Sequence, residues 1–592
     1  MYFVFCKNKI KASLNIQIIV IYCFFCKKVS RLSKAVYKIK VLFFHLLNLY
    51  GFGKSFYFMR KILLLLIPFF FSCGGDAENT TNLERKVFHY MQHRSVTSLD
   101  PAFARSQANI WAIDHLYNGL VQLDDGLNIQ PGIAKSWTIS DDGLTYTFTL
   151  REDVFFHDNA AFPDGKGRRV KASDVAYSFE RVWKGSINSP GSWIFNNRVT
   201  NDNPFQAPDD NTFILKLAKP FRPMLGILTM QYCSIVPKEA VEKYGADFRK
   251  NPVGTGAFKF KRWLENQSLF LIKNNNYFEK ENGQQLPYLD GVRVSFVGDR
   301  KTAYLELIGG KTDFMSGLES SFVNELLSPQ GELLSKQAEK LSFLKSPFLN
   351  SEYLGIKMNT DGNNPLSNKK IRQALNFGFD RAKMLRTMRN DVGKPANSGF
   401  TPIGLPSFSA ESVKGYNFNP DKARQLLSEA GYPNGKGLPT IELLTTKDYE
   451  DLCTFISRQW EDLGIKTQIE LEESATLRQK MSKGQAPFFR ASWIADYPDA
   501  ESFLTVFYGK NPAPPNYTQF KNTQFDALYE KALNENDDAK RYKLYQQMDA
   551  IIMEEAPVVF LFYDETAWFV KKGITGLSKN AINLLSLKRV KK

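Results

Sequence analysis

Two hydrophobic periods alternate along this chain, and no other feature of the sequence constrains its fold as strongly. The segment Thr145-Tyr146-Thr147-Phe148-Thr149-Leu150 alternates polar and apolar residues without exception after a turn cluster at 140–143, which predicts a β-hairpin with one buried face. Ala172–Trp183 has apolar residues at helical spacing and predicts a helix with Ser173 as its N-cap. Segments of both kinds recur along the chain, so the sequence predicts α/β lobes.

The remaining predicted elements follow the same two periods. Asn419 and Pro420 supply a good N-cap and first helical residue, and Gly431 is expected to end the helix that they begin. Further strands are predicted at 87–91, 212–217, 257–263, 441–444, 467–471 and 558–562, and further helices at 110–120, after residue 523, and at 539–555.

Length and charge narrow the class of protein. A chain of 592 residues, 43% hydrophobic and 14% aromatic, is too long for one ordinary domain, so two or three lobes are expected. The formal net charge of +16 is concentrated at the N-terminus, since residues 1–58 hold ten Lys or Arg and no Asp or Glu. From Cys73 onward 65 basic residues face 61 acidic ones, which removes the support for a nucleic-acid partner.

A secretory signal is predicted at residues 59–72. Arg60 and Lys61 precede the ten-residue apolar run 62–71, and Ser72-Cys73-Gly74-Gly75 follows it directly. This run is about half the 20 residues that a membrane-spanning helix needs, so cleavage is expected. The small residue before Cys73 and the glycine after it resemble a lipobox and predict lipidation of Cys73. The alternative is an ordinary signal peptide with an incidental cysteine.

Residues 1–58 do not fit this scheme, because a secretory signal must lie at the N-terminus to be recognised. We expect them to be a non-native extension translated from upstream DNA, with Met59 as the true start. The alternative is a membrane-embedded extension, but its apolar runs, 16–26 and 41–50, are short for spanning helices.

Cysteine and histidine usage gives no metal site. Beyond Cys73 only Cys233 and Cys453 remain, without metal-type spacing, and each is interpreted as a small buried apolar residue, with a disulfide between them left open. His89 and His93 are four residues apart, but this interval puts two ligands on one face only in a helix, and their segment is strand-like.

The most specific run of the sequence begins at Ala134-Lys135-Ser136-Trp137, continues through Tyr146-Thr147-Phe148 to Phe156-His157-Asp158, and ends with Lys171-Ala172-Ser173-Asp174-Val175. Further segments, in order along residues 85–570, lie at 99–101, 116–120, 252–256, 371–375, 420–432 and 493–499. Together these segments resemble the bacterial extracellular solute-binding proteins of family five, the peptide and nickel branch.

The resemblance implies an α/β fold, that of a two-lobed periplasmic binding protein (type II-like) with an additional subdomain. The lobes of such a protein close on a ligand by a hinge motion. By analogy, a main lobe would combine residues 85–123, 252–350 and 562–592, residues 124–251 would form the extra subdomain, and residues 351–561 the second lobe. No cofactor is expected.

The resemblance also implies which residues bind the ligand. In peptide-binding members of the family, the acid of a W-x-x-D-Y segment pairs with the α-ammonium group of the ligand, and the arginine three residues before the tryptophan can meet a ligand carboxylate. These positions are Asp496 and Arg490 here, with Trp493 and Tyr497 expected to line the site. The alternative is that Asp496 only caps a turn before Pro498.

The expected function is capture of oligopeptides by an extracytoplasmic lipoprotein that delivers them to the permease subunits of an ABC importer. We expect a monomer at the periplasmic or cell-surface side of a bacterial membrane, held by its lipid anchor. Within the fold, a metallophore, haem or an oligosaccharide is the alternative ligand, and a signalling role is the alternative to import. Direct nickel binding is disfavoured, because the histidines of the body, 89, 93, 115 and 157, all lie in the first half.

A secreted hydrolase is the alternative from another class. The sequence contains no G-x-S-x-G elbow and no H-E-x-x-H helix. The carboxylate pair Asp496 and Asp499 is more easily interpreted as turn and ligand contacts than as a glycosidase pair. We therefore predict that the protein is not an enzyme.

Overall fold

The computed structural model describes residues 86–319, 322–359 and 364–592. The predicted extension at 1–58, the predicted signal at 59–72 and Cys73 lie outside the described residues. No helix within the described ranges is both long and apolar enough to cross a membrane.

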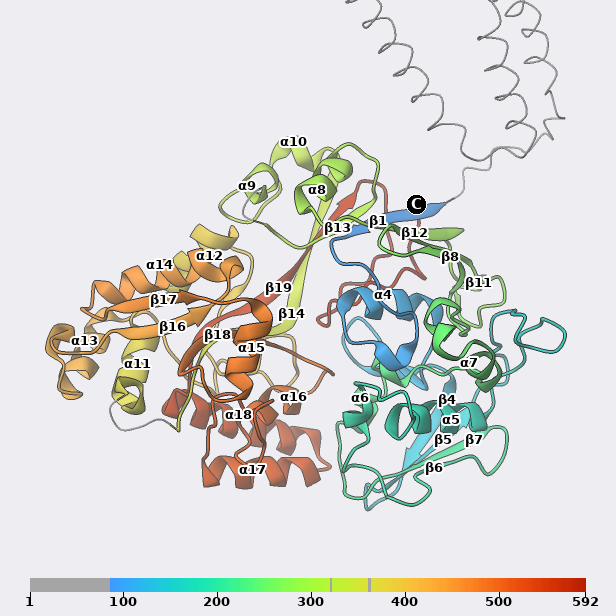
Figure 1. The fold of residues 1–592 in the computed structure, drawn as a ribbon, viewed down its shortest axis with the longest axis horizontal. Coiled ribbons are helices and arrows are strands. Elements are labelled where there is room, and N and C mark those ends of the chain that lie inside the picture. The colour runs from blue at the N-terminus through green and yellow to red at the C-terminus, as the bar shows by residue number, and fades with distance from the viewer. Residues whose placement is uncertain (1–85, 320–321, 360–363) are drawn as a thin grey trace, which may run out of the picture. The chain divides into compact units, whose positions relative to one another are not determined.

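One long mixed sheet runs through the described chain (Figure 1). Its strands follow the order β17-β16-β18-β14-β19-β13-β1-β12-β9-β8, and β15 pairs with β19. In chain order, the strands are β1 (Val87–Gln92), β8 (Phe258–Leu264), β9 (Ser268–Lys273), β12 (Gly291–Phe296), β13 (Phe314–Ser316), β14 (Leu341–Ile356), β15 (Lys394–Pro395), β16 (Ile441–Thr445), β17 (Thr467–Leu471), β18 (Phe488–Ile494) and β19 (Val558–Lys571).

Two long antiparallel strands, β14 and β19, join the two ends of this sheet. Residues 341–347 of β14 pair with residues 565–571 of β19, and residues 351–355 pair with residues 558–563. The register shifts between Pro347 and Ser351, where proline can donate no ladder hydrogen bond. Beyond this irregularity β14 also pairs with β18, while the other end of β19 pairs with β13.

A separate four-stranded sheet, β4-β5-β7-β6, is covered by helix α5. Its strands are β4 (Ala134–Ile139), β5 (Thr145–Leu150), β6 (Phe205–Gln206) and β7 (Thr212–Lys216), and α5 spans Ala172–Trp183. The predicted hairpin is confirmed, because the buried face of β5 carries Tyr146, Phe148 and Leu150. Phe179 of α5 packs edge-on against Phe213 of β7, with ring centroids 5.5 Å apart. Two short hairpins, β2 (Val121–Leu123) with β3 (Ile129–Pro131) and β10 (Lys280–Glu281) with β11 (Gln284–Gln285), lie apart from both sheets.

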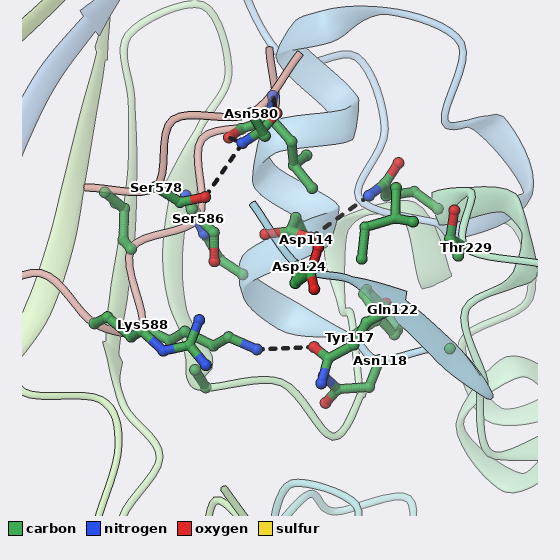
Figure 2. Close-up of a pocket in the computed structure, with 18 of the residues that line it drawn as sticks. Asp114, Tyr117, Asn118, Gln122, Asp124, Thr229, Ser578, Asn580, Ser586 and Lys588 are labelled. Carbon is green, nitrogen blue, oxygen red and sulfur yellow. Dashed lines mark hydrogen bonds between the residues drawn. The ribbon is translucent and has the colours of Figure 1, made fainter. Parts of the chain in front are cut away.

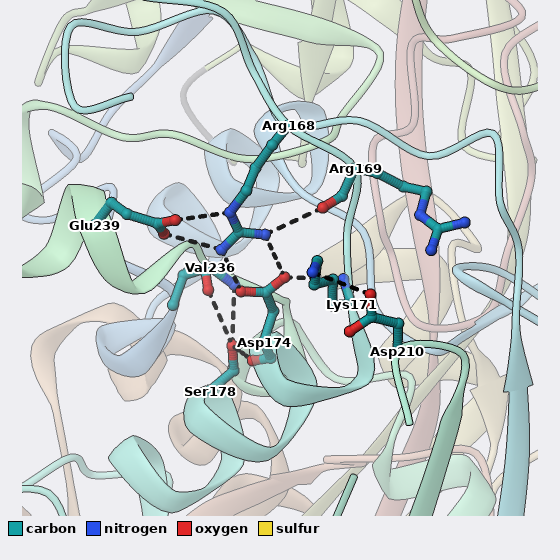
Figure 3. A network of polar contacts seen from close by, with 8 residues as sticks. All are labelled: Arg168, Arg169, Lys171, Asp174, Ser178, Asp210, Val236 and Glu239. Carbon is teal, nitrogen blue, oxygen red and sulfur yellow. Dashed lines mark hydrogen bonds and ion pairs between the residues drawn. The ribbon is translucent and has the colours of Figure 1, made fainter. Parts of the chain in front are cut away.

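The predicted bounds of α5 are confirmed, but its predicted N-cap is wrong. The N-cap is Lys171, and Ser173 lies inside the first turn. Asp174 takes over the capping role, since its carboxylate accepts the backbone N–H of Lys171 at 2.9 Å. Arg168 holds this carboxylate with two hydrogen bonds of 2.7 Å (Figure 3). Sequence spacing pointed to the serine because hydroxyl side chains are common N-caps.

Most other helices lie in the second half. Asn419 caps α13 as predicted, accepting from the backbone N–H of Lys422, and Gly431 follows its end with φ of 93°. The longer helices are α4 (Gln107–Leu116), α8 (Arg300–Ile308), α11 (Lys369–Phe377), α12 (Arg381–Arg389), α13 (Pro420–Glu429), α14 (Glu450–Glu461), α15 (Ser474–Ser482), α17 (Thr523–Asn534) and α18 (Asp538–Glu555). The short ones are α6 (Met224–Ile227), α7 (Lys238–Tyr244), α9 (Val323–Leu326), α10 (Ser335–Ala338) and α16 (Glu501–Leu504).

Three large hydrophobic cores organise these elements into two lobes. One core surrounds β1, α4, β5, α5 and β12, and we call the elements around it the first lobe. The other two lie around α17 and α18 and around α11, α13 and α14, and we call the elements around them the second lobe. A smaller cluster joins α8 and α9 to β19. The residue borders given above for the lobes and the subdomain stay a prediction.

Cys233 and Cys453 are buried free thiols in different cores. The Nδ1–H group of His89 donates to the Lys311 carbonyl oxygen, and its Nε2 forms a hydrogen bond with the Ser295 hydroxyl group, each at 2.9 Å. The described part of the chain contains no cluster of three or more acidic, cysteine or histidine side chains that could hold a metal ion.

Candidate functional site

The predicted site lies on β18 and on the turn that follows it. β18 is paired without interruption to β14, with Arg490 opposite Leu354 and Trp493 opposite Ser351. Because successive side chains of a strand point to opposite faces, Arg490 and Trp493, three residues apart, lie on opposite faces of the sheet. The strand therefore does not bring these two predicted residues together.

Arg490 lies in a buried ion pair. Its guanidinium group contacts the carboxylate of Glu352, and the two side chains are 10% and 5% exposed. The group also stacks over the Tyr449 ring, 3.1 Å from the ring centre. Burial works against the charge of Arg490, but the Glu352 carboxylate outweighs it and holds the arginine pKa above its usual value. A ligand carboxylate would have to share Arg490 with Glu352.

Trp493 and Asp496 are fixed by the short helix α16. The indole N–H of Trp493 donates to the Ser502 carbonyl at 2.5 Å, and the backbone N–H of Asp496 donates to the Ser502 hydroxyl at 3.2 Å. These hydrogen bonds hold the backbone of the turn and do not involve the Asp496 side chain. Its carboxylate forms no hydrogen bond or ion pair with any described residue.

Asp496 combines an accessible side chain with a strongly perturbed pKa. Solvent reaches the side chain, yet the surrounding protein atoms raise the pKa of its carboxyl to about 6, with the charge of Glu501 adding to the effect and Arg198 opposing it. A side chain can be reached by solvent and still be surrounded by protein atoms when it faces a narrow space between packed elements. A cationic group of matching size would relieve the cost of ionising this acid.

A second acid, Glu501, is buried in the same turn, and its charge acts on Asp496. Its carboxylate accepts hydrogen bonds from the hydroxyl groups of Tyr497 and Tyr529, and only 2% of the residue is exposed. Burial raises its pKa, while Arg198 and the two hydroxyl groups oppose that rise. Hydrogen bonds to Ser502 and Glu501 thus hold the turn after β18.

The first lobe faces this turn directly. Tyr497 belongs to the second lobe by sequence, but it packs into the hydrophobic core of the first. Its ring stacks against Trp193 with centroids 6.5 Å apart and an interplanar angle of 29°. A methyl group on Gly226 would lie 3.7 Å from Pro498. Arg198 is held on this wall by the Trp193 carbonyl at 2.6 Å.

A polar cavity of about 100 Å³ lies elsewhere in the first lobe, between the end of α4, β2 and the C-terminal segment (Figure 2). Lys588 reaches across it to the Gln122 side chain at 2.8 Å and to Glu279. Burial raises the pKa of Asp114 to about 6 against the opposing charge of Lys588. Sequence reasoning did not anticipate this cavity, because its walls come from three segments with no shared motif.

The structure thus brings Asp496 and Tyr497 to the contact between the lobes, with Trp493 behind them and Arg490 on the other face of β18. Sequence reasoning missed the first-lobe residues that meet them, Trp193 and Arg198. The feature of the sequence that could have indicated them is the segment 190–198, in which a tryptophan and an arginine follow proline and glycine.

Comparison with known proteins identifies the family to which this chain belongs. A family model described as bacterial extracellular solute-binding proteins, family 5 Middle, matches residues 128–515. The chain is 30% identical over 504 residues to heme-binding protein A of Haemophilus influenzae, covering 81% of this chain and 87% of the relative. It is 28% identical over 491 residues to the glutathione-binding protein GsiB of Escherichia coli K12, covering 81% and 89%.

Among solved structures, the periplasmic binding protein DppA of Helicobacter pylori in complex with the peptide STSA matches with a TM-score of 0.70 and 26% identity, covering 85% of this chain and 97% of that one. Because the family model spans more than half of the chain, this protein belongs to the bacterial extracellular solute-binding proteins of family 5, the two-lobed α/β binding proteins that serve ABC transporters.

Proposed function

We propose that this protein captures oligopeptides between its two lobes and delivers them, as a monomer, to the permease subunits of an ABC importer. The observation that carries the proposal is the Asp496 carboxylate, which is accessible, crowded and without a partner among the described residues. An acid in such a place favours a ligand that brings its own positive charge. The α-ammonium group of a peptide fits this requirement.

The relatives support a ligand of this class. The DppA structure holds a tetrapeptide, and GsiB is named for glutathione, which also carries an α-ammonium group. Heme-binding protein A is named for a ligand of different chemistry, so haem is the alternative solute. We further propose that Trp493 and Tyr497 line the site and that Arg490, sharing its charge with Glu352, meets a ligand carboxylate.

The decisive experiment is titration calorimetry with Ala-Ala-Ala, its N-acetylated form, glutathione and haem. Asp496→Asn keeps the shape and removes the charge, so the affinity for Ala-Ala-Ala should fall by on the order of 2 to 5 kcal/mol, the range for breaking a buried charge pair. The N-acetylated peptide should be affected little. Asp448→Asn, at an exposed position, is the matched control and should bind like the wild type.

Two outcomes would redirect the proposal. An unchanged affinity of Asp496→Asn for Ala-Ala-Ala would remove the peptide assignment and leave a solute receptor of other specificity. Tight binding of haem alone would favour the alternative ligand. Mass spectrometry of the recovered peptides adds a test against the hydrolase alternative, since a receptor returns its peptides intact and a peptidase returns fragments.

We also propose that the protein is exported and anchored by a lipid on Cys73, at the periplasmic or cell-surface side of the membrane. The support is the sequence alone: a basic start, a short apolar run and a small residue before Cys73. Cys73→Ser should move the protein from the membrane fraction to the soluble fraction. N-terminal peptides of the native protein from before Met59 would contradict the proposed start.

A further inference from the structure

Tyr232 occupies an unusual position on the first-lobe wall. It lies in the 3-10 turn Gln231–Cys233, and only 7% of the residue is exposed. Its ring rests on the α-carbon of Gly191, where an added methyl group would lie 2.5 Å from one ring carbon and 2.7 Å from the next. Any side chain at position 191 would therefore displace the base of this ring. Gly191 provides the seat that Tyr232 needs.

The seat places Tyr232 opposite the acid of the proposed site. Gly191 precedes the 3-10 turn Ser192–Ile194, whose Trp193 stacks on Tyr497, the neighbour of Asp496. Gly226, six residues before Tyr232 in the chain, also lies against this turn, because an added methyl group there would be 3.7 Å from Pro498 and 3.9 Å from Tyr497. The Trp193 contact with Tyr497 therefore brings this part of the first-lobe wall close to Asp496. In agreement, burial and then the charge of Asp496 raise the pKa of Tyr232 to about 12, with Arg105 opposing.

The hydroxyl group of Tyr232 has no hydrogen-bond partner among the described residues. Some polar side-chain atoms of the described residues are buried with neither a partner nor contact with solvent. The Tyr232 hydroxyl oxygen is not one of them, so solvent reaches it. Buried tyrosines normally satisfy their hydroxyl group. Tyr497 and Tyr529, in the same contact, both donate to Glu501. The Tyr232 hydroxyl group is therefore free of protein partners among the described residues and open to solvent.

We infer that Tyr232 is a specificity-determining residue that contacts the ligand, its hydroxyl oxygen accepting a hydrogen bond from the same ammonium group that pairs with Asp496. This inference rests on the proposed function. An ammonium group has several N–H donors, and a carboxylate on one side leaves at least one free. A neutral oxygen fixed on the opposite wall satisfies that donor without adding charge. The site would then select ligands whose cationic group retains N–H bonds.

Tyr232→Phe removes only the oxygen and is the test. Calorimetry should show a loss of affinity for Ala-Ala-Ala of about tenfold, as expected for a hydrogen bond to a charged group, and a loss of less than about twofold for the N-acetylated peptide. Tyr177→Phe, at a half-buried tyrosine of the first lobe, is the matched control and should change neither affinity. The melting temperature without ligand should be the same for all three proteins.

The combination with Asp496→Asn separates the two proposals. If both residues hold one ammonium group, the double variant should lose less than the product of the two single losses, because either change already impairs the shared contact. Wild-type affinity of Tyr232→Phe together with weakened Asp496→Asn would overturn the inference and leave the proposed function intact. Wild-type affinity of Asp496→Asn would overturn both.

The seat itself can be tested through Gly191. Gly191→Ala should weaken binding of Ala-Ala-Ala at least about tenfold by displacing the ring that carries the hydroxyl group. In a Tyr232→Ala background there is no ring to displace, so Gly191→Ala should then have no further effect. An equal loss in both backgrounds would show that position 191 acts independently of Tyr232 and would count against the inference.

Discussion

The Asp496 carboxyl, with a pKa of about 6, titrates close to neutral pH, so peptide affinity should depend on pH. An ammonium group pairs with the ionised acid, and the α-amino group of a peptide stays protonated below about pH 7.7. Affinity should therefore be greatest near pH 7 and fall through pH 6, and at pH 5 it should be roughly three- to tenfold lower. Calorimetry at both pH values measures this, and Asp496→Asn should flatten the profile.

A different acid, Asp549, affects stability rather than binding. Its buried carboxylate on α18 accepts the backbone N–H groups of Phe400 at 2.7 Å and Thr401 at 3.2 Å. Burial raises its pKa to about 6 against these hydrogen bonds. The folded protein thus holds this proton more tightly than the unfolded chain does, so the contribution of Asp549 to stability is lost as pH rises through 6.

Asp549→Asn tests this balance, because asparagine keeps an acceptor oxygen and has no charge to desolvate. At pH 7.5 the free energy of unfolding should rise by on the order of 1 to 3 kcal/mol, and at pH 4 the gain should largely vanish. Urea denaturation at the two pH values gives both numbers. Destabilisation at pH 7.5 that disappears at pH 4 would instead show that the two N–H groups require an ionised acceptor.

At the level of elements, Arg168 ties helix α5 to helix α7. Its guanidinium group binds Asp174 at the start of α5 and Glu239 of α7, at 2.6 to 2.9 Å (Figure 3). The Asp174 side chain is only 4% exposed, so loss of the arginine leaves a nearly buried charge without its ionic partner. The other charges in this network contact solvent and are screened more strongly.

Arg168→Met should therefore lower the free energy of unfolding by about 1 to 3 kcal/mol, below the full range for a buried pair because Arg168 is partly exposed. The exposed pair Lys166 and Asp158 lies close by in the sequence, and Lys166→Met should cost less than about 0.5 kcal/mol. Adding Asp174→Asn to Arg168→Met should recover part of the loss. A cost equal to that of Lys166→Met would show that solvent already compensates Asp174.

The sequence predicted elements well where a local pattern decides them, and poorly where distant pairing does. The bounds of α5 follow from its amphipathic spacing. By contrast, β19 was predicted at 558–562 and continues to Lys571. The polar residues at 564–566 break the apolar pattern there, and the strand persists because β14, and then β13, supply partners from far along the chain.

The same division holds for the candidate site. Asp496 and Tyr497 could be predicted because one contiguous segment, 493–499, carries the family pattern. Tyr232 could not, since its position depends on a turn, on the missing side chain of Gly191 and on the approach of the other lobe. No local spacing encodes such a convergence. For the same reason, the pairing of Arg490 with Glu352 across β14 was not anticipated.

For the molecule as a whole, β14 and β19 are the structural link between the lobes. Each strand belongs to both halves of the long sheet, and their register shifts between Pro347 and Ser351 and again between Glu352 and Tyr353. A ladder interrupted in this way bends more easily than a continuous one. We therefore expect this irregularity to be the hinge, with the contact between Trp193 and Tyr497 forming and breaking as the lobes move.

Ligand binding should then compact the protein. The contact between Trp193 and Tyr497 should stabilise the closed form by the same amount whichever peptide is bound. Small-angle scattering should show a smaller radius of gyration with saturating Ala-Ala-Ala than without it. Trp193→Ala removes an aromatic pair worth about 0.5 to 1.5 kcal/mol, so it should weaken Ala-Ala-Ala and its N-acetylated form by the same factor, roughly two- to tenfold. Asp496→Asn, by contrast, should discriminate between these two peptides. Identical scattering with and without a tightly bound peptide would contradict closure on the ligand. A loss in Trp193→Ala confined to the free-amine peptide would show that the Trp193 contact belongs to ligand recognition and not to closure.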